Sequence, residues 1–178
     1  MTSKIINLFG APCAGKSSLA ARLYSDYSCG GIKCELVTEF AKDLTWAERF
    51  KDMRVQPYIF GKQLLKIERL IGKVDVIITD SPLLLSLIYT TEKWPPSYSQ
   101  SVYEIYNGHN NYNFLLHRNW EYSSVGRNQT EKEATEIHEK IEGLLHGYNV
   151  HYVDLYVNRR GPEICGELSK RVRVLCTV

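Results

Sequence analysis

Eight residues near the start of the chain have the composition and spacing of a phosphate-binding loop. The run Gly10–Ser17 reads GAPCAGKS, which is GxxxxGKS, and it directly follows an apolar segment at 5–9. The glycines allow backbone N–H groups to surround a polyphosphate, while Lys16 reaches the β and γ phosphates and the Ser17 hydroxyl binds Mg²⁺. A glycine-rich turn that only caps a helix would not need this lysine. We therefore predict a nucleoside triphosphate site formed by Gly10, Ala11, Pro12, Cys13, Ala14, Gly15, Lys16, Ser17 and Ser18.

A carboxylate stands where a magnesium ligand is expected. The apolar segment 74–79 ends in Asp80, and ligands of open α/β sheets lie beyond the carboxyl ends of the strands. In a P-loop protein, a carboxylate at this place holds Mg²⁺ directly or through water. The alternative is that Asp80 caps a helix opening at Ser81 and Pro82, and one side chain can do both. We predict a metal site made of Ser17 and Asp80.

A second carboxylate follows the apolar segment 34–38. Glu39 at this strand end would lie close to the γ-phosphate, where it could orient or deprotonate an acceptor hydroxyl. The alternatives are a helix N-cap or a salt bridge with Lys42 or Lys16. Asp43, one turn further on the following helix, is the second candidate for the same role.

Three residues of a later helical segment are candidates for substrate binding. Gln63 shares a helical stripe with Phe60, so its amide points inward and needs partners. A bidentate bond to a base or carboxamide would satisfy it, and so would backbone within the core. Tyr58 and Phe60 could stack on an aromatic ring, although aromatics at helical spacing are more often core residues.

A polar segment after the fourth predicted strand has the composition of a lid. It begins with His117 and Arg118 and continues through Trp120, Tyr122 and Gly126 to Arg127. Two arginines and a glycine at about 118–130 fit a loop that closes over the nucleotide and brings guanidinium charge to the transferring phosphoryl group. A solvated turn is the alternative for each arginine alone. We expect His117 to be structural rather than a base.

Apolar runs rich in β-branched residues alternate with segments of helical period, which is typical of a parallel sheet covered by helices. Strands are predicted at 5–9, 34–38, 74–79, 112–116 and 150–153. Thr130 and Glu133 form a capping-box signature, which predicts that a helix starts at Thr130. The segment around Trp94, Pro95 and Pro96 should be a surface loop that leads into a helix near 101–106.

The composition indicates one globular domain over residues 1–178, with 44% hydrophobic residues. A formal charge of +2 is too balanced to argue for a nucleic-acid-coating surface. The five cysteines contain no CxxC pair, so free thiols are expected, and no apolar stretch is long enough to cross a bilayer. These features predict a soluble cytoplasmic protein that uses no membrane, and no feature points to a particular oligomeric state.

The motifs together resemble the nucleoside and nucleotide kinase group of P-loop phosphotransferases. They look most like small NadR-like AAA-type kinase domains often encoded by bacteriophages, in which case the compartment is the host cytoplasm. The resemblance covers most of residues 3–155 and leaves a basic tail at 156–178 outside it. It rests on the segments GAPCAGKSS at 10–18, ELVTEFAKDL at 35–44, YIFGKQ at 58–63, VIITDSPLL at 76–84 and VGRNQTEKEA at 125–134.

This resemblance implies a three-layer α/β/α fold with a five-stranded parallel sheet in order 2-3-1-4-5, ATP with Mg²⁺ as donor, and an acceptor bound between Glu39 and the lid. Deoxynucleoside kinases similarly carry a Glu at that strand end and a substrate-reading Gln, like Glu39 and Gln63. Those kinases usually have an arginine directly after the acidic residue that ends the third strand, whereas Asp80 is followed by Ser81. The resemblance therefore does not identify the substrate of this chain.

The primary interpretation is a kinase that phosphorylates a nucleoside-like small molecule, with Lys16, Glu39, Asp80, Arg118 and Arg127 as its catalytic residues. A kinase acting on a hydroxymethylated base in DNA is an alternative, because the tail is basic and Trp94, Tyr98 and Trp120 could hold a strand. A nucleotide-dependent NTPase switch is an alternative of another class. A GTPase is disfavoured because the sequence contains no NKxD motif.

Overall fold

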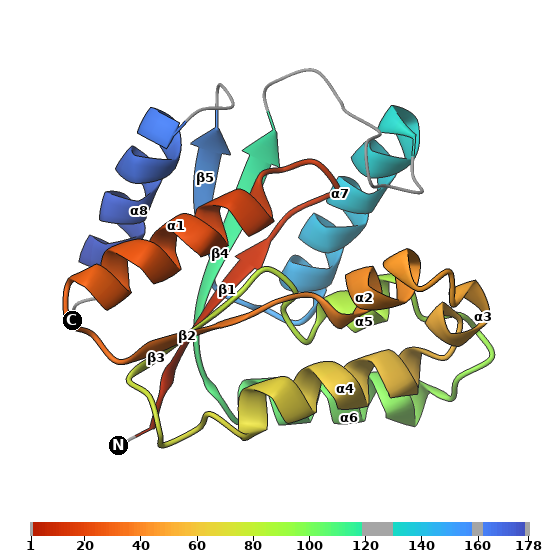
Figure 1. Cartoon of the computed structure of the whole chain (residues 1–178). Coiled ribbons are helices and arrows are strands. Elements are labelled where there is room, and N and C mark those ends of the chain that lie inside the picture. The colour runs from red at the N-terminus through yellow and green to blue at the C-terminus, as the bar shows by residue number, and fades with distance from the viewer. Residues whose placement is uncertain (1, 119–129, 158–161, 177–178) are drawn as a thin grey trace.

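The computed structural model describes residues 2–118, 130–157 and 162–176. Its centre is a five-stranded parallel sheet with the strand order β2-β3-β1-β4-β5, as predicted (Figure 1). Because all strands run the same way, their carboxyl ends meet at one edge of the sheet. The strands are β1 (Lys4–Phe9), β2 (Cys34–Val37), β3 (Val76–Thr79), β4 (Asn110–Arg118) and β5 (Val153–Val157).

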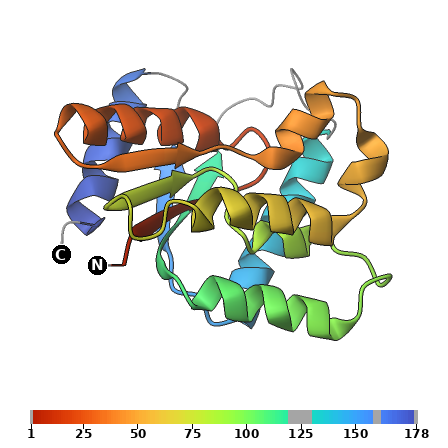
Figure 2. The same cartoon turned by 60° about the horizontal axis from the view of Figure 1, so that its bottom comes forward.

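Helices cover both faces of this sheet, which gives three layers (Figures 1 and 2). One face carries α1 (Lys16–Cys29) and α8 (Pro162–Cys176), which pack against each other. Beyond the carboxyl end of β2, α2 (Phe40–Trp46) and α3 (Phe50–Met53) pack against each other and against α4 (Gln56–Glu68) (Figure 1). The remaining described helices are α5 (Leu85–Ile88), α6 (Pro96–Asn107) and α7 (Glu131–Gly147).

The central strand β1 supplies side chains to both apolar cores. Ile6 and Leu8 belong to the core under α1 and α8, whereas Ile5 and Phe9 belong to the core under α4, α6 and α7. This division follows from the pleat of a strand, which turns successive side chains to opposite faces. A strand buried on both faces reads as a continuous apolar run, which is why the sequence alone located β1.

One residue of β1 is polar and fully buried. The Asn7 amide donates to the side-chain oxygens of Asn111 and Asn113 on β4, at 2.9 and 3.0 Å. The Tyr106 hydroxyl of α6 donates to the same Asn113 oxygen at 2.7 Å, and burial raises the pKa of Tyr106 above its ordinary value. Because a buried amide must be hydrogen-bonded, this network favours one register between β1 and β4.

The last strand begins later than predicted. Residues 150–152, which we assigned to a strand, lie in the connection after α7, where Asn149 adopts a left-handed φ of 53° and Val150 N–H donates to the Leu145 carbonyl at 2.8 Å. This arrangement satisfies a carbonyl that the last turn of α7 would otherwise leave without a partner. The strand β5 therefore begins only at Val153 and ends at Val157.

Other boundaries also differ from the prediction, most clearly in β4, which spans Asn110–Arg118 rather than 112–116. The strand β3 starts at Val76 rather than at 74, because Val74 N–H bonds the Leu70 carbonyl after α4. The helix α6 starts at Pro96, well before 101, since a proline fits the first turn of a helix. The capping box at the start of α7 is confirmed, with Thr130 and Glu133 bonded in both directions.

The described helices include none with the length and hydropathy of a membrane-spanning segment.

Candidate active site

The phosphate-binding loop connects β1 to α1 at the carboxyl edge of the sheet (Figure 1). Its backbone passes through positive φ values at Gly10 (147°), Cys13 (69°) and Gly15 (87°). A Cβ atom added at Gly10 would lie 3.0 Å from the Leu116 carbonyl oxygen and 3.1 Å from the Ala14 Cβ. The loop thus closes tightly against the end of β4, which only glycine permits at this position.

The loop presents positive partial charge where α1 begins. Gly15 is the N-cap of α1, and the first turn has neither a side-chain cap nor an acidic residue. The Lys16 ammonium lies over the loop, where it donates to the carbonyls of Gly10 at 2.7 Å and Ala11 at 3.0 Å. A helix N-terminus without an acidic residue, with a lysine beside it, fits a polyphosphate.

The two predicted magnesium ligands are in direct contact. The Ser17 hydroxyl donates to Asp80 Oδ2 at 2.5 Å, and the backbone N–H of Glu39 donates to Asp80 Oδ1 at 3.1 Å. A hydroxyl and a carboxylate are hard oxygen ligands, so this pair suits Mg²⁺. The alternative that Asp80 caps a helix at Ser81 does not hold, because the helix after β3 begins only at Leu85.

Glu39 is the second residue after β2, at the edge of the sheet that carries the phosphate loop. It occupies the N-cap position of α2 but makes no side-chain cap bond. Burial raises the pKa of its carboxyl, the Lys16 ammonium lowers it, and the Asp80 carboxylate raises it again, so the net pKa lies above the ordinary value. The structure therefore places a partly desolvated carboxylate near both the Lys16 ammonium and the Asp80 carboxylate.

Sequence reasoning missed Tyr89, the residue that follows α5. Desolvation of its hydroxyl, and then the Glu39 carboxylate, raise the pKa of Tyr89 to about 12. Tyr89 therefore lies near enough to Glu39 for the two groups to interact electrostatically, and 44% of the residue's surface stays exposed. No motif marks Tyr89, because it lies 50 residues from Glu39 in sequence and only the fold brings them together.

The predicted substrate residues of α4 lie mostly inside the protein. Gln63 is buried, with its oxygen accepting from Phe40 N–H at 3.1 Å and its amide donating to the Thr79 hydroxyl at 3.4 Å. This matches the alternative in which the amide bonds within the core. Phe60 is a core residue, whereas Tyr58 is half-buried and meets the Phe40 ring edge-on. The Gln63 contacts join α4 to the start of α2 and to β3.

Two charged residues that we predicted to act at the site, Asp43 and Arg118, form ion pairs with residues of neighbouring helices. The exposed Asp43 accepts from Lys66 on α4 at 3.4 Å. Arg118 ends β4 at the carboxyl edge and pairs with Glu131 of α7 at 3.0 Å. Arg127, Trp120, Tyr122, Gly126 and most of the predicted lid at 118–130 lie outside the described residues.

This sheet order, together with a GxxxxGKS loop and a Ser17–Asp80 pair at its carboxyl edge, defines a nucleotide-binding P-loop domain with a kinase-like fold. The family model of the AAA domain matches residues 5–160, and the chain belongs to this AAA domain family. The finer resemblance to phage-type NadR-like domains stays a prediction. No curated protein shows significant sequence similarity to the chain.

Solved structures share the fold at low sequence identity. The deoxyadenosine kinase from M. mycoides with bound dATP is 16% identical, with a TM-score of 0.54 over 93% of this chain and 97% of the kinase chain. The crystal structure of APE1195 is also 16% identical, with a TM-score of 0.47 over 98% of this chain and 97% of that chain. The likeness to the deoxyadenosine kinase supports the fold alone.

Proposed function

We propose that the protein is an ATP-dependent kinase that transfers the γ-phosphate to a nucleoside, nucleotide or similar small molecule. The observation that carries this proposal is the position of Glu39, a desolvated carboxylate beside Lys16 that does not belong to the Ser17–Asp80 pair. An acceptor hydroxyl needs such a group, which can accept its proton as the oxygen attacks phosphorus.

The other residues take roles that their positions support. Lys16 binds the β and γ phosphates, and Ser17 with Asp80 would hold Mg²⁺, which supplies positive charge against the phosphate oxygens. Glu39 orients the acceptor hydroxyl and takes its proton. Arg118, at the carboxyl end of β4, would exchange its contact with Glu131 for the transferring phosphoryl group and stabilise the charge that develops there.

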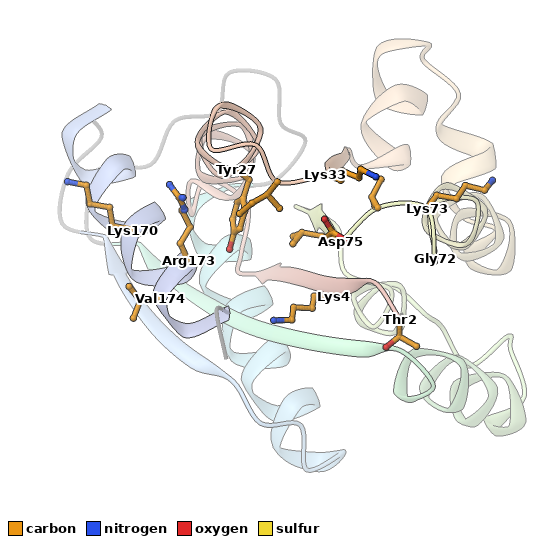
Figure 3. Close-up of a pocket in the computed structure, with 13 residues that line it drawn as sticks. Thr2, Lys4, Tyr27, Lys33, Gly72, Lys73, Asp75, Lys170, Arg173 and Val174 are labelled. Atoms are coloured by element: carbon orange, nitrogen blue, oxygen red, sulfur yellow. The ribbon is translucent and has the colours of Figure 1, made fainter.

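A small acceptor suits this site better than a DNA strand. Of the basic tail, Lys170 and Arg173 lie on α8 and line a cavity of about 1040 Å³ together with Lys4 and Lys33 (Figure 3). Lys4 begins β1 and Lys33 precedes β2, so the cavity opens at the amino edge of the sheet, opposite the phosphate loop. Lys170 and Arg173 therefore do not extend the surface around Glu39.

The test is acceptor-dependent ADP release with ATP and Mg²⁺. The acceptors are deoxynucleosides, nucleotides, nicotinamide riboside, and single- and double-stranded DNA with and without hydroxymethylated bases, and each product is identified by mass. We expect one class of small molecule to be phosphorylated. The Glu39→Gln variant should lose about 10²–10⁴-fold in kcat at saturating substrates, because general base catalysis typically contributes this factor.

Glu35→Gln is the matched control, because Glu35 is exposed and lies near the amino end of β2, whereas Glu39 follows its carboxyl end. It should keep wild-type turnover, and Lys16→Ala should abolish transfer. Slow ADP release that ignores every acceptor would refute the kinase and favour an NTPase switch. Unchanged turnover in Glu39→Gln would remove Glu39 as the base.

A further inference from the structure

A cluster of two histidines and one glutamate lies between β4 and α7, outside the phosphate site. His117 is the last but one residue of β4, and His138 and Glu142 lie one turn apart on α7. One ligand atom from each of the three side chains lies within 4.8 Å of the other two. Our expectation that His117 is structural does not account for this convergence of three metal-ligating groups.

The distances within the cluster approach those of a coordination shell. His138 Nε2 lies 3.2 Å from His117 Nδ1 and 3.6 Å from Glu142 Oε1. Two nitrogens bound to one tetrahedral zinc lie about 3.3 Å apart, since each Zn–N bond is about 2.0–2.1 Å long. The Glu142 side chain is 39% exposed and can rotate to complete the set.

A fourth residue orients the first histidine. Asp154 of β5 accepts from His117 Nε2 at 2.6 Å, which leaves His117 Nδ1 as the nitrogen whose lone pair faces His138. Metal-binding histidines almost always donate their other ring N–H to such a carboxylate or to a carbonyl. The His117 ring is further fixed by Tyr156, which stacks on it at a centroid distance of 4.5 Å.

The donor types also suit a divalent transition metal. Two imidazole rings and the Glu142 carboxylate converge on one place, and the Asp154 carboxylate lies behind His117. Imidazole nitrogens favour zinc and its neighbours over Mg²⁺ or Ca²⁺, which prefer oxygen. The side chains of His117 and His138 are 19% and 22% exposed, which leaves a path for the ion.

We propose that His117, His138 and Glu142 bind a divalent first-row transition metal, with Zn²⁺ as the first candidate and Asp154 as the residue that orients His117. The three protein ligands leave one tetrahedral position for water. A metal here joins α7 to the end of β4 and is separate from the magnesium site at Ser17 and Asp80.

The test is a titration of the chelator-treated full-length protein with Co²⁺, followed by its visible d–d absorption and by displacement with Zn²⁺. Excess Mg²⁺ is present throughout to occupy the hard-oxygen site. We expect one equivalent of tetrahedral Co²⁺ that Zn²⁺ displaces. His138→Ala and Glu142→Gln should abolish or strongly weaken binding, and Asp154→Asn should weaken it about 10–100-fold.

His146→Ala is the matched control, because His146 lies on the same helix and bonds the Tyr152 hydroxyl instead. It should bind Co²⁺ like the wild type, and so should Ser17→Ala. Circular dichroism shows whether each variant is folded. If His138→Ala does not fold, Glu142→Gln still tests the proposal. The proposal is overturned if the folded wild type binds no Co²⁺, in which case the histidines only share a hydrogen bond. It is equally overturned if binding survives Glu142→Gln and His138→Ala unchanged, or is lost in Ser17→Ala.

Discussion

At the scale of single residues, backbone conformation limits which side chains the phosphate loop accepts. Gly10 combines a φ of 147° with a Leu116 carbonyl oxygen that would lie 3.0 Å from an added Cβ. We expect Gly10→Ala to lower the free energy of unfolding by about 1–3 kcal/mol and to weaken ATP binding. Chemical denaturation and calorimetry with ATP measure the two effects.

Gly143→Ala is the control for this substitution. Gly143 lies on α7 with nothing within 4 Å of an added Cβ, so the alanine should stabilise the protein by about 0.4–1 kcal/mol. A Gly10→Ala variant as stable as Gly143→Ala would contradict the tight closure of the loop on β4.

The ionised Glu39 carboxylate should lower the free energy of unfolding at neutral pH. Because its pKa is raised in the folded protein, the unfolded chain loses the proton first as pH rises past the ordinary value of 4.5. Ionisation therefore favours the unfolded state, and the stability contributed by the protonated group is lost as pH rises through the folded pKa. Without nucleotide or Mg²⁺, Glu39→Gln should be more stable than the wild type at pH 7 but not at pH 4. Urea denaturation at both pH values tests this, and the same gain in Glu35→Gln would contradict it.

At the scale of elements, the C-terminal helix α8 is tied to α1 by a polar contact as well as by apolar packing. The Ser169 hydroxyl is fully buried and donates to Asp26 Oδ2 at 2.6 Å. Leu168 and Val172 join the core under α1. The basic tail that we placed outside the family resemblance thus includes a helix that completes one layer of the fold.

Removing this contact should loosen α8. Ser169→Ala leaves Asp26 without its buried donor, so we expect a loss of about 1–3 kcal/mol in the free energy of unfolding. Ser25→Ala, at an exposed position of α1, should change it by less than about 0.5 kcal/mol. Equal effects of the two substitutions in urea denaturation would argue against the contact.

The same contact predicts a pH dependence. Burial raises the pKa of Asp26, but the Ser169 hydroxyl and Arg22 outweigh it, and the net pKa lies below the ordinary 3.8. A lowered pKa means that the ionised group stabilises the folded state above the ordinary value and that this contribution is lost as pH falls through the folded pKa. The difference in the free energy of unfolding between the wild type and Asp26→Asn, measured by urea denaturation, should therefore shrink as the pH falls below 3.8.

At the scale of the whole molecule, two basic regions occupy opposite edges of the sheet. Lys16 lies at the carboxyl edge, and the cavity with Lys73 and Lys170 lies at the amino edge (Figure 3). A strand of six residues such as β1 spans roughly 16–20 Å, whereas the Debye length is about 8 Å at physiological ionic strength. The amino-edge lysines should therefore contribute little to nucleotide binding.

We expect the double variant Lys73→Ala/Lys170→Ala to bind ATP with wild-type affinity in calorimetry at physiological salt. Lys16→Ala in the same assay should show a loss of at least about tenfold, because it removes a direct phosphate ligand. A tenfold loss in the double variant would mean that the two edges are not electrostatically independent.

The sequence by itself determined the phosphate loop, the capping box of α7 and the strand ends that carry Glu39 and Asp80. These features are local: the spacing of glycines, a lysine and caps is read within a few residues, and apolar runs mark strands buried on both faces. Sequence also suggested the correct strand order, through a resemblance that rests on several such local motifs.

The tertiary structure alone decided the contacts that join distant segments. Gln63 bonds Phe40 N–H and the Thr79 hydroxyl, and neither partner can be identified from the period of a helix. The start of β5 depended on how the end of α7 satisfies its carbonyls. His117, His138 and Glu142 come from a strand and a helix that meet only when the sheet is assembled. Local patterns fix an element's type and face, but which side chains meet is set by packing, because each partner lies on a different element.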